Sequence, residues 1–458
     1  MTTPIRAEQP EPSGAVPSRR HPVAITALIL LIVATAVTVA TREPTSDAVT
    51  PTVVSTPGTV ADATPAPSQN STSVPTQPPK GTPGPSVTPA PSATATAQPS
   101  AIIDSNRYSY EPGWGTLEVQ AFLDTQPGTL KSAAYSAGGQ RISLAAAIAD
   151  QSLLYNINPK VLLTILEMES GLVRGANPSP NEIGWAVGYR QDKAWGLGPQ
   201  VNWAARELYR SAREDPSPIA ARGWGSFAVA RLLSQTVDRD TQGWTFERSA
   251  SVFVQTYKAL FGEDPRIAPT AIPAPAAGPF LRPPYALANV VASSAFDHEF
   301  PTLSENGSMV TSRGQRNQSS YDGHDGWDYV LSTGNSVLAA AAGRVLVAGW
   351  SDDACAQAAG AVILDHENGY RTLYWHLSSV GVKPGDRVVA GDVLGKSGNT
   401  GCSLGAHLHF GTQYLGKATD PNGWCPEGTV KADPWAAHPA GIVSLWLWTD
   451  RSSQCTVR

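Results

Sequence analysis

Charged residues are scarce in this sequence. Aspartate, glutamate, lysine and arginine make up 16% of its 458 residues, and the formal net charge is −5. No part of the chain gathers lysine and arginine into a basic stripe, which binding to the phosphates of a nucleic acid requires. We therefore expect no nucleic-acid partner.

Cysteine is also rare. The four cysteines all lie in the last quarter of the chain, and none has the spacing of a zinc finger. Four cysteines allow three pairings, and the sequence alone does not select one of them. We favour the disulfides Cys355–Cys402 and Cys425–Cys455 over four buried thiols, because we expect an exported protein, which meets an oxidising compartment.

Charge is absent altogether from residues 22–41, and this run of about 20 residues is just long enough to span a bilayer. Arginines precede it, so the positive-inside rule predicts a cytoplasmic N-terminus at residues 1–21 and a single-pass anchor with the C-terminus outside. A signal peptide is the alternative, because Ala34-Thr35-Ala36 fits a cleavage site and cleavage would give a secreted protein. Either way we expect most of the chain at the cell surface or outside the cell, with the membrane as a partner of this segment.

Residues 42–100 consist mostly of proline, threonine, serine, alanine and valine. Such a segment buries too little apolar surface to offset the entropy of ordering it, so we predict a disordered linker. At about 3 Å per residue in polyproline form, it reaches on the order of 150 Å.

The remaining residues predict two domains of different class. Apolar residues recur at spacings of three and four in residues 101–264, which predicts an α-helical domain with its clearest helices in 142–157, 158–172, 201–214 and 247–262. A Pro/Ala-rich joint follows at 265–285. Residues 286–458 carry period-two and short apolar runs interrupted by glycine, which predicts an all-β domain with strands in 336–350, 360–378, 386–398 and 407–414. Asn368-Gly369 is a strong hairpin signal within it.

Seven of the eight histidines lie between positions 298 and 438, and four of them fall in three compact motifs. These motifs are "HDGWD" with His324 and Asp328, "YWH" with His376, and "HLH" with His407 and His409. Residues i and i+2 of a strand point to the same face, so the last two histidines project into one space. Two imidazoles and a carboxylate form a common catalytic zinc set with one position left for water. Because the five groups exceed three protein ligands, two histidines are available for proton transfer or oxyanion binding.

The segment that carries these motifs resembles the lysostaphin-type zinc metallopeptidases, which have H-x-G-x-D, Y-x-H and H-x-H signatures in this order. The resemblance implies that His324, Asp328 and His409 bind Zn²⁺, and that His376 and His407 flank the metal as catalytic residues. Members of this family cut peptide bonds in the stems or cross-links of bacterial peptidoglycan. Many relatives that have lost one or more of these residues only bind or regulate, whereas this sequence keeps all five. The favoured Cys355–Cys402 bond would brace the loop before the H-x-H strand.

The other histidines fall outside the three motifs. His366 lies directly before the Asn-Gly turn, and we predict a structural role for it. We expect His298 and His438 to titrate on the surface.

One carboxylate stands out in the helical domain. In the helix predicted at 158–172, Asn158 is a suitable N-cap, Pro159 suits the first turn and Gly171 suits the exit. Glu169 falls on the same face as the apolar residues and near the helix C-terminus, and both positions raise the pKa of a carboxyl. A carboxylic acid that keeps its proton is what protonation of a glycosidic oxygen requires.

This helix resembles that of the soluble lytic transglycosylases and goose-type lysozymes, whose catalytic glutamate precedes a serine in an E-S-G turn. The resemblance implies that Glu169 is a general acid. The alternative is a helical domain that only grips glycan.

Together these features predict an exported zinc metalloendopeptidase that degrades or remodels peptidoglycan, linked to a glycan-binding or glycan-cleaving domain. The alternatives are a catalytically inactive protein that binds the cell wall or regulates another enzyme, and an autolysin regulated by a second protein. The sequence does not select the bond that is cut, or a hydrolase over a transglycosylase.

Overall fold

The computed structural model describes residues 101–213, 223–236, 246–269, 273–274, 278–298, 308–317, 323–353, 355–426, 431–438 and 441–451. All of the described residues belong to one compact unit. The predicted cytoplasmic N-terminus 1–21, the membrane segment 22–41 and the linker 42–100 lie outside the described residues. Within the described part of the chain, no helix combines the length and hydrophobicity that crossing a membrane requires.

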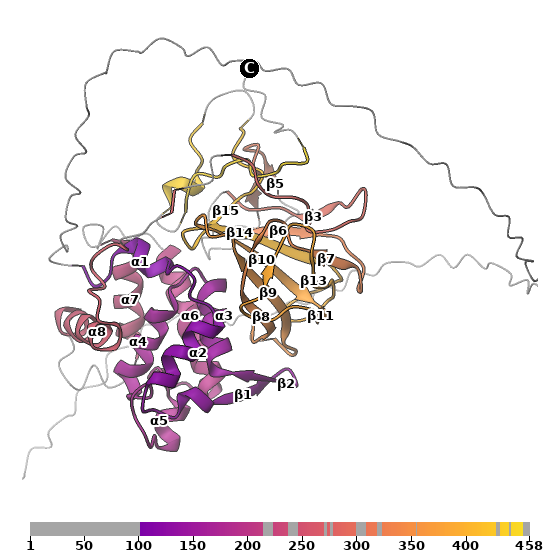
Figure 1. Cartoon of the computed structure of the whole chain (residues 1–458). Helices are drawn as coiled ribbons and strands as arrows, with labels where there is room; N and C mark the ends of the chain where they lie inside the picture. Colours follow the sequence, from indigo (N-terminus) through magenta and orange to yellow (C-terminus); the bar gives the residue numbers. More distant parts are fainter. Residues whose placement is uncertain are drawn as a thin grey trace, which may run out of the picture. The chain divides into compact units, whose positions relative to one another are not determined.

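The first half of the described chain is helical, as its apolar spacing predicts (Figure 1). Its helices are α1 (Ser105–Ser109), α2 (Thr116–Thr125), α3 (Leu144–Leu154), α4 (Pro159–Ser170), α5 (Pro180–Gly184), α6 (Leu197–Arg213), α7 (Trp224–Gln235) and α8 (Phe246–Phe261). A hairpin of β1 (Ala134–Ala137) and β2 (Gln140–Ser143) precedes α3. The sequence does not predict this hairpin, because each strand has four residues and only one of the eight is buried.

Helix α4 begins and ends as its sequence predicts. The Asn158 side chain accepts a hydrogen bond from the Lys160 N–H, and Pro159 occupies the first turn. Gly171 ends the helix in the left-handed region, with φ of 64°. These signals are local, which is why the sequence alone locates them.

The side of α4 that carries Lys160 and Thr164 is buried together with the apolar side, because every residue from Pro159 to Leu166 is buried. Lys160 Nζ lies 2.8 Å from a carboxylate oxygen of Glu111 and 2.9 Å from one of Glu263. These two ion pairs compensate the charge of a lysine that is 3% exposed. Helix α4 is therefore a central helix rather than an amphipathic surface helix.

The second half is β-rich, also as predicted. Its strands are β3 (Ala292–Ser294), β4 (Met309–Val310), β5 (Arg316–Asn317), β6 (Gly326–Tyr329), β7 (Ser336–Leu338), β8 (Gly343–Ser351), β9 (Ala359–Asp365), β10 (Tyr370–Leu377), β11 (Ser379–Val380), β12 (Arg387–Val388), β13 (Val393–Lys396), β14 (Leu408–Tyr414) and β15 (Lys417–Thr419). The main sheet is antiparallel in the order β12-β8-β9-β10-β14-β6-β3, with β15 paired to β14. A second sheet has the order β11-β13-β7, and β4 pairs with β5. The hairpin β9–β10 turns at Asn368-Gly369, as predicted.

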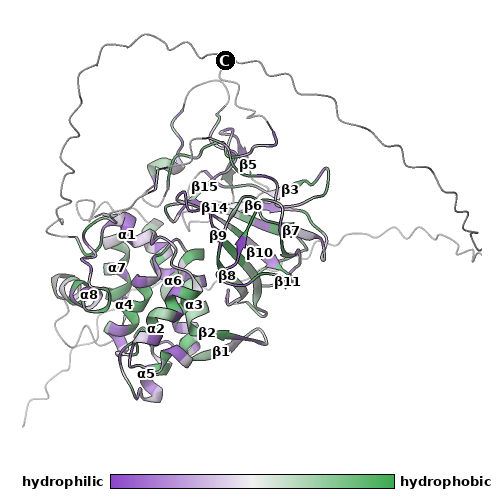
Figure 2. Ribbon diagram, in the orientation of Figure 1, coloured by the Kyte–Doolittle hydropathy of each residue, from purple (hydrophilic) through white to green (hydrophobic). Residues whose placement is uncertain are grey.

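Strand β9 is buried at all seven positions, because both faces of the main sheet are covered. Ala359, Ala361 and Ile363 pack in one hydrophobic core with residues of the helices, among them Leu163 of α4. On the other face, Val362 and Leu364 belong to the core of the β-rich half. This explains why the sequence of β9 is a continuous apolar run rather than an alternating one, and Figure 2 shows strong hydrophobicity in α4 and around β8 and β9.

A buried polar network joins α3 to strand β8 within this shared core. Asp150 is 3% exposed, and one of its carboxylate oxygens accepts hydrogen bonds from the Ser351 hydroxyl and, at 3.1 Å, from Gln151 Nε2. Gln151 Nε2 also donates to the Asp352 carbonyl at 2.8 Å. The other oxygen of Asp150, Oδ1, makes no hydrogen bond within the described residues. Burial raises the pKa of Asp150 from its ordinary 3.8 to about 7, although the hydrogen bonds from Ser351 and Gln151 oppose this.

Candidate metal centre

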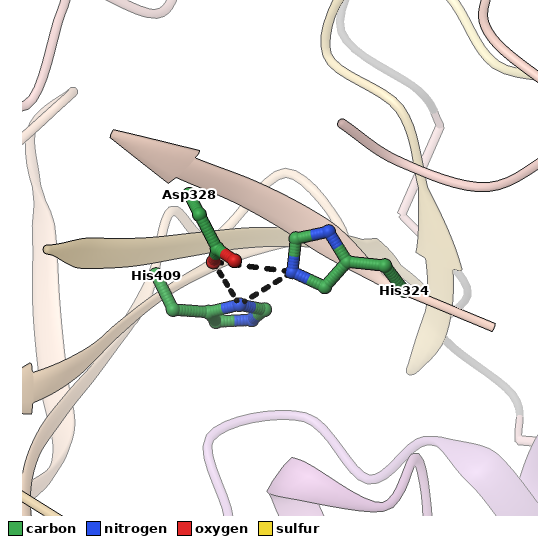
Figure 3. Close-up of side chains that lie close together, drawn as sticks. All are labelled: His324, Asp328 and His409. Atoms are coloured by element: carbon green, nitrogen blue, oxygen red, sulfur yellow. Dashed lines mark hydrogen bonds and ion pairs between the residues drawn. The ribbon is translucent and has the colours of Figure 1, made fainter. Parts of the chain in front are cut away.

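Pairing of strands β6 and β14 brings the predicted metal ligands together. Asp328 and His409 are direct cross-strand partners, so their side chains project side by side from the same face of the sheet. His324 lies two residues before β6 and reaches the same point (Figure 3). Two of the three side chains are thus placed by strand register and the third by a short segment of chain.

The donor atoms of these three residues lie within 4.8 Å of one another. Asp328 Oδ1 is 3.2 Å from His324 Nε2 and 3.1 Å from His409 Nδ1, and the two ring nitrogens are 3.0 Å apart. Ligands at 2.0–2.1 Å from a tetrahedral Zn²⁺ are separated by about 3.4 Å. The three donors are therefore arranged as three corners of a zinc tetrahedron, and their chemistry, two imidazoles and one carboxylate, is that of a catalytic zinc site.

Hydrogen bonds from the surrounding chain select the donor nitrogen of His324. Its Nδ1 lies 3.0 Å from the Ala295 carbonyl oxygen and 3.0 Å from Ser294 Oγ. A carbonyl can only accept, so this contact assigns the proton to Nδ1 and leaves the lone pair of Nε2 for the metal.

Gly326 allows the His409 ring to lie against strand β6. A Cβ at this position would lie 2.7 Å from His409 Cε1 and 2.8 Å from Nε2, closer than carbon atoms approach. The glycine of the H-x-G-x-D signature therefore makes room for the imidazole of the H-x-H signature.

His376 and His407, the predicted catalytic residues, lie beside the three predicted ligands. The rings of His376 and His407 have centroids 4.6 Å apart, and His376 is 6.2 Å from the ring of His409. His407 Nε2 lies 3.6 Å from Asp328 Oδ1. The structure thus brings together all five side chains that the sequence motifs single out.

The backbone of His376 is in the left-handed region, with φ of 65°, which is uncommon for a residue other than glycine. It lies where the register between β9 and β10 shifts, between Tyr374 and Leu377. Such a bulge changes the direction of a side chain, and strained conformations of this kind cluster at functional sites. Burial and the neighbouring His409 lower the pKa of His376 to about 3, so its imidazole is neutral.

Contacts within the predicted ligand set shift the pKa values of Asp328 and His409. Burial raises the pKa of Asp328, but hydrogen bonds with His324 and His409 outweigh it and hold the pKa well below the usual range. Burial lowers the pKa of His409, and its contact with Asp328 reverses this to a net increase. The carboxylate is therefore ionised and available as a ligand.

Two expectations about the remaining histidines are wrong. His298 is 0% exposed and His438 is 2% exposed, so neither titrates on the surface. The ring of His298 lies between Asp433 Oδ1, 3.0 Å from Nδ1, and Asp420 Oδ2, 2.9 Å from Nε2. Burial opposes its ionisation, but these two contacts raise the pKa of His298 to about 9. Sequence separations of 122 and 135 residues explain why local pattern could not reveal this cluster.

Asp297, the residue before His298, holds the segment that carries His324, and no local pattern in the sequence marks it. The N–H of Asp297 donates to the His324 carbonyl at 2.8 Å, and its carboxylate accepts from the N–H of Gly323 at 2.9 Å. The predicted structural role of His366 agrees with its contacts, because its Nδ1 lies 2.8 Å from the Ala342 carbonyl and its Nε2 2.9 Å from Thr372 Oγ1.

The predicted disulfide Cys355–Cys402 is present and spans 47 residues of sequence. It closes onto the loop that ends five residues later at His407, and the N–H of Cys402 donates to Asp353 at 2.8 Å. Cys425 is also disulfide-bonded, while its predicted partner Cys455 lies outside the described residues.

Glu169 lies in the last turn of α4, as predicted, and is half-buried. A Cβ at Gly188 would lie 2.8 Å from Glu169 Oε2, so the carboxylate packs closely against this glycine, whose φ is 75°.

Comparison with known proteins identifies two family domains. Residues 322–421 match Peptidase family M23, and residues 101–273 match the LasA N-terminal domain. The second match covers the part for which the sequence analysis predicted a lysozyme-like domain. The chain therefore carries a C-terminal M23 peptidase domain, whose family depends on zinc, behind a LasA N-terminal domain.

A glycyl-glycine endopeptidase and lysostaphin are among the similar proteins. Glycyl-glycine endopeptidase ALE-1 of Staphylococcus capitis is 40% identical over 87 residues, which are 19% of this chain and 24% of that protein. Lysostaphin of Staphylococcus staphylolyticus is 39% identical over 87 residues, 19% of this chain and 18% of that protein. A solved structure of lysostaphin from Staphylococcus simulans aligns with 32% of this chain and 53% of its own, at 29% identity and a TM-score of 0.24. The chain thus spans about a quarter or less of the length of these curated relatives.

Proposed function

We propose that this chain, with its M23 peptidase domain at residues 322–421, is an exported zinc metalloendopeptidase that cuts peptide bonds in the stems or cross-links of peptidoglycan. One observation carries the proposal. The donor atoms of His324, Asp328 and His409 lie within 4.8 Å of one another, and His376 and His407 lie beside them. Zinc in such a site polarises a carbonyl and lowers the pKa of a bound water to about 7.

His407 and His376 are suited to move protons in this reaction. His407 Nδ1 lies 2.7 Å from the Gly405 carbonyl oxygen, and His376 Nδ1 lies 2.8 Å from that of Thr400. In the neutral form of either ring, the carbonyl fixes the proton on Nδ1 and leaves the lone pair on Nε2. Either Nε2 can accept the proton of the attacking water and later donate it to the leaving amine.

Single substitutions separate metal binding from proton transfer. We expect His409→Ala to lose stoichiometric zinc, and His407→Ala to keep zinc but lose about 10²- to 10⁴-fold in peptide cleavage. Zinc is measured in the purified proteins, and cleavage is measured by mass spectrometry of fragments released from peptidoglycan, with and without a chelator. Cleavage that resists the chelator would reject the zinc mechanism. Wild-type protein without stoichiometric zinc would support the alternative, an inactive protein that binds or regulates.

We further propose that the helical part engages the glycan strands of the same polymer, with Glu169 as the candidate general acid. Its position against Gly188 at the end of a central helix supports this role. If Glu169 cleaves glycan, Glu169→Gln abolishes the release of glycan fragments while peptide cleavage continues. Unchanged release would leave the helical part with a binding role only.

Action on peptidoglycan requires that the chain be exported. The uncharged segment 22–41 supports an exported protein, either anchored through that segment or secreted after its cleavage. Sequencing the N-terminus of the protein recovered from membranes and from medium distinguishes the two.

A further inference from the structure

A tyrosine of the helical part reaches the edge of the metal centre. The hydroxyl of Tyr209 on α6 donates a hydrogen bond to Asp325 Oδ2 at 3.2 Å. Asn202 lies two turns earlier on the same face of α6, and its side chain donates to the Asp352 carbonyl at 2.9 Å. This face of α6 therefore contacts the β-rich half at two points, which fix the position of Tyr209.

Asp325 also faces the metal ligand His409. Its other oxygen, Oδ1, lies 3.8 Å from His409 Nε2, on the side of the ring opposite to the Nδ1 that points at Asp328 and His324. The Asp325 side chain is 28% exposed, so this interaction is partly shielded from water.

A carboxylate beside the second ring nitrogen of a histidine changes how strongly that histidine binds a metal. A histidine that binds metal through one nitrogen usually presents its other N–H to a carboxylate or carbonyl, which fixes the ring and makes it a better donor. The contact of 3.8 Å is longer than a hydrogen bond, so the influence of Asp325 on His409 is electrostatic.

We propose that Asp325 is a positioning residue for the zinc ligand His409, and that Tyr209 holds the Asp325 carboxylate in the orientation that this requires. The two carboxylate oxygens make different contacts: Oδ2 accepts the hydrogen bond from the Tyr209 hydroxyl, and Oδ1 faces the His409 imidazole. The inference rests on the proposed zinc role of His409. It makes the helical part a contributor to the metal site, in addition to any contact with glycan.

Zinc affinity of the full-length protein, measured by competition with a chromogenic chelator, tests the proposal without recourse to activity. We expect Asp325→Asn, which removes the charge and keeps the shape, to weaken zinc binding about 10- to 100-fold. Tyr209→Phe removes only the hydroxyl and should weaken it roughly three- to tenfold, since it acts through a second residue. In the cobalt-substituted proteins, both changes should shift the visible absorption bands.

The double variant Tyr209→Phe/Asp325→Asn distinguishes positioning from general stability. If Tyr209 acts through Asp325, the double variant binds zinc as weakly as Asp325→Asn and no more weakly. Multiplied effects would overturn the proposed route.

Two control variants match the chemistry of these changes. Tyr155→Phe removes the hydroxyl of a ring whose centroid lies 5.2 Å from that of the Tyr209 ring. Glu367→Gln removes one charge on the exposed β9–β10 turn, where Glu367 pairs with Arg387. Neither should change zinc affinity.

The outcomes separate this proposal from the proposed function. Wild-type protein that binds no zinc rejects the metal centre itself. Wild type that binds one zinc, with Asp325→Asn and Tyr209→Phe within twofold of it, overturns the positioning role alone. If Tyr209→Phe does not fold, Asp325→Asn still decides whether the carboxylate supports His409.

Discussion

The buried carboxylate of Asp150 predicts that the protein loses stability as the pH rises from 4 to 7. In the folded protein the pKa of Asp150 is raised to about 7, whereas its ordinary value is 3.8. Between these values the unfolded chain binds fewer protons than the folded one, so the free energy of unfolding falls with increasing pH. Below pH 4 both states hold the proton and above pH 7 neither does, so the loss is confined to this window.

The magnitude follows from the separation of the two values. One pKa unit corresponds to 1.36 kcal/mol, so a rise from 3.8 to about 7 costs about 4 kcal/mol at pH 8. Asp150→Asn removes this cost, because the amide is neutral at every pH and its oxygen can still accept the Ser351 hydroxyl. A difference in packing between the amide and the carboxyl changes the free energy of unfolding by the same amount at every pH.

Urea unfolding followed by fluorescence of the 13 tryptophans measures the effect. Both proteins are studied with intact disulfides and a chelator, so that pH-dependent metal binding does not contribute. We expect the stability of Asp150→Asn relative to wild type to increase by about 4 kcal/mol from pH 4 to pH 8. The control, Asp124→Asn on the exposed surface of α2, should show no such increase. A difference between Asp150→Asn and wild type that stays constant from pH 4 to pH 8 would refute the reasoning.

Three further predictions follow from the β-rich half. Gly326→Ala should lower zinc affinity by more than about tenfold, because the added Cβ would lie 2.7 Å from His409 Cε1 and displace the ring. A zinc titration that gives the wild-type affinity would contradict this. His298→Gln should destabilise the protein by about 3 kcal/mol more at pH 6 than at pH 9.5. The raised pKa of His298, about 9, adds stability below pH 6.5, and this stability is lost as the pH rises through 9. Equal losses of stability in urea unfolding at both pH values would contradict this. Replacing Cys355 and Cys402 by alanine should lower the free energy of unfolding by about 4 kcal/mol, because the bond closes a loop of 47 residues in the unfolded chain. Unchanged stability in urea unfolding would contradict this.

The features that the sequence could predict are local or repeat along one strand. The caps Asn158 and Gly171 lie within one helix, and the i, i+2 spacing of His407 and His409 needs only an extended backbone. Once β6 pairs with β14, Asp328 faces His409, so three signatures in order were enough to anticipate the metal centre.

The features that the sequence could not predict depend on packing between distant segments. The buried site of His298 depends on carboxylates more than a hundred residues away, and the hydrogen bond from Tyr209 to Asp325 joins residues 116 positions apart. The raised pKa of Asp150 has the same origin, because it arises where α3 packs on β8. In each case a polar residue has no local signal that distinguishes it from a surface residue.

The core shared by the helices and the main sheet has a consequence for dissecting the protein into parts. A truncated chain that begins at residue 286 would lose the helices that cover Leu346, Ile363, Leu373 and Trp375, which are at most 4% exposed in the intact molecule. These side chains would form a contiguous apolar surface on a sheet, which is a recognised cause of aggregation. The peptidase part of this protein is therefore best produced together with its helical partner, or with polar replacements at those four positions.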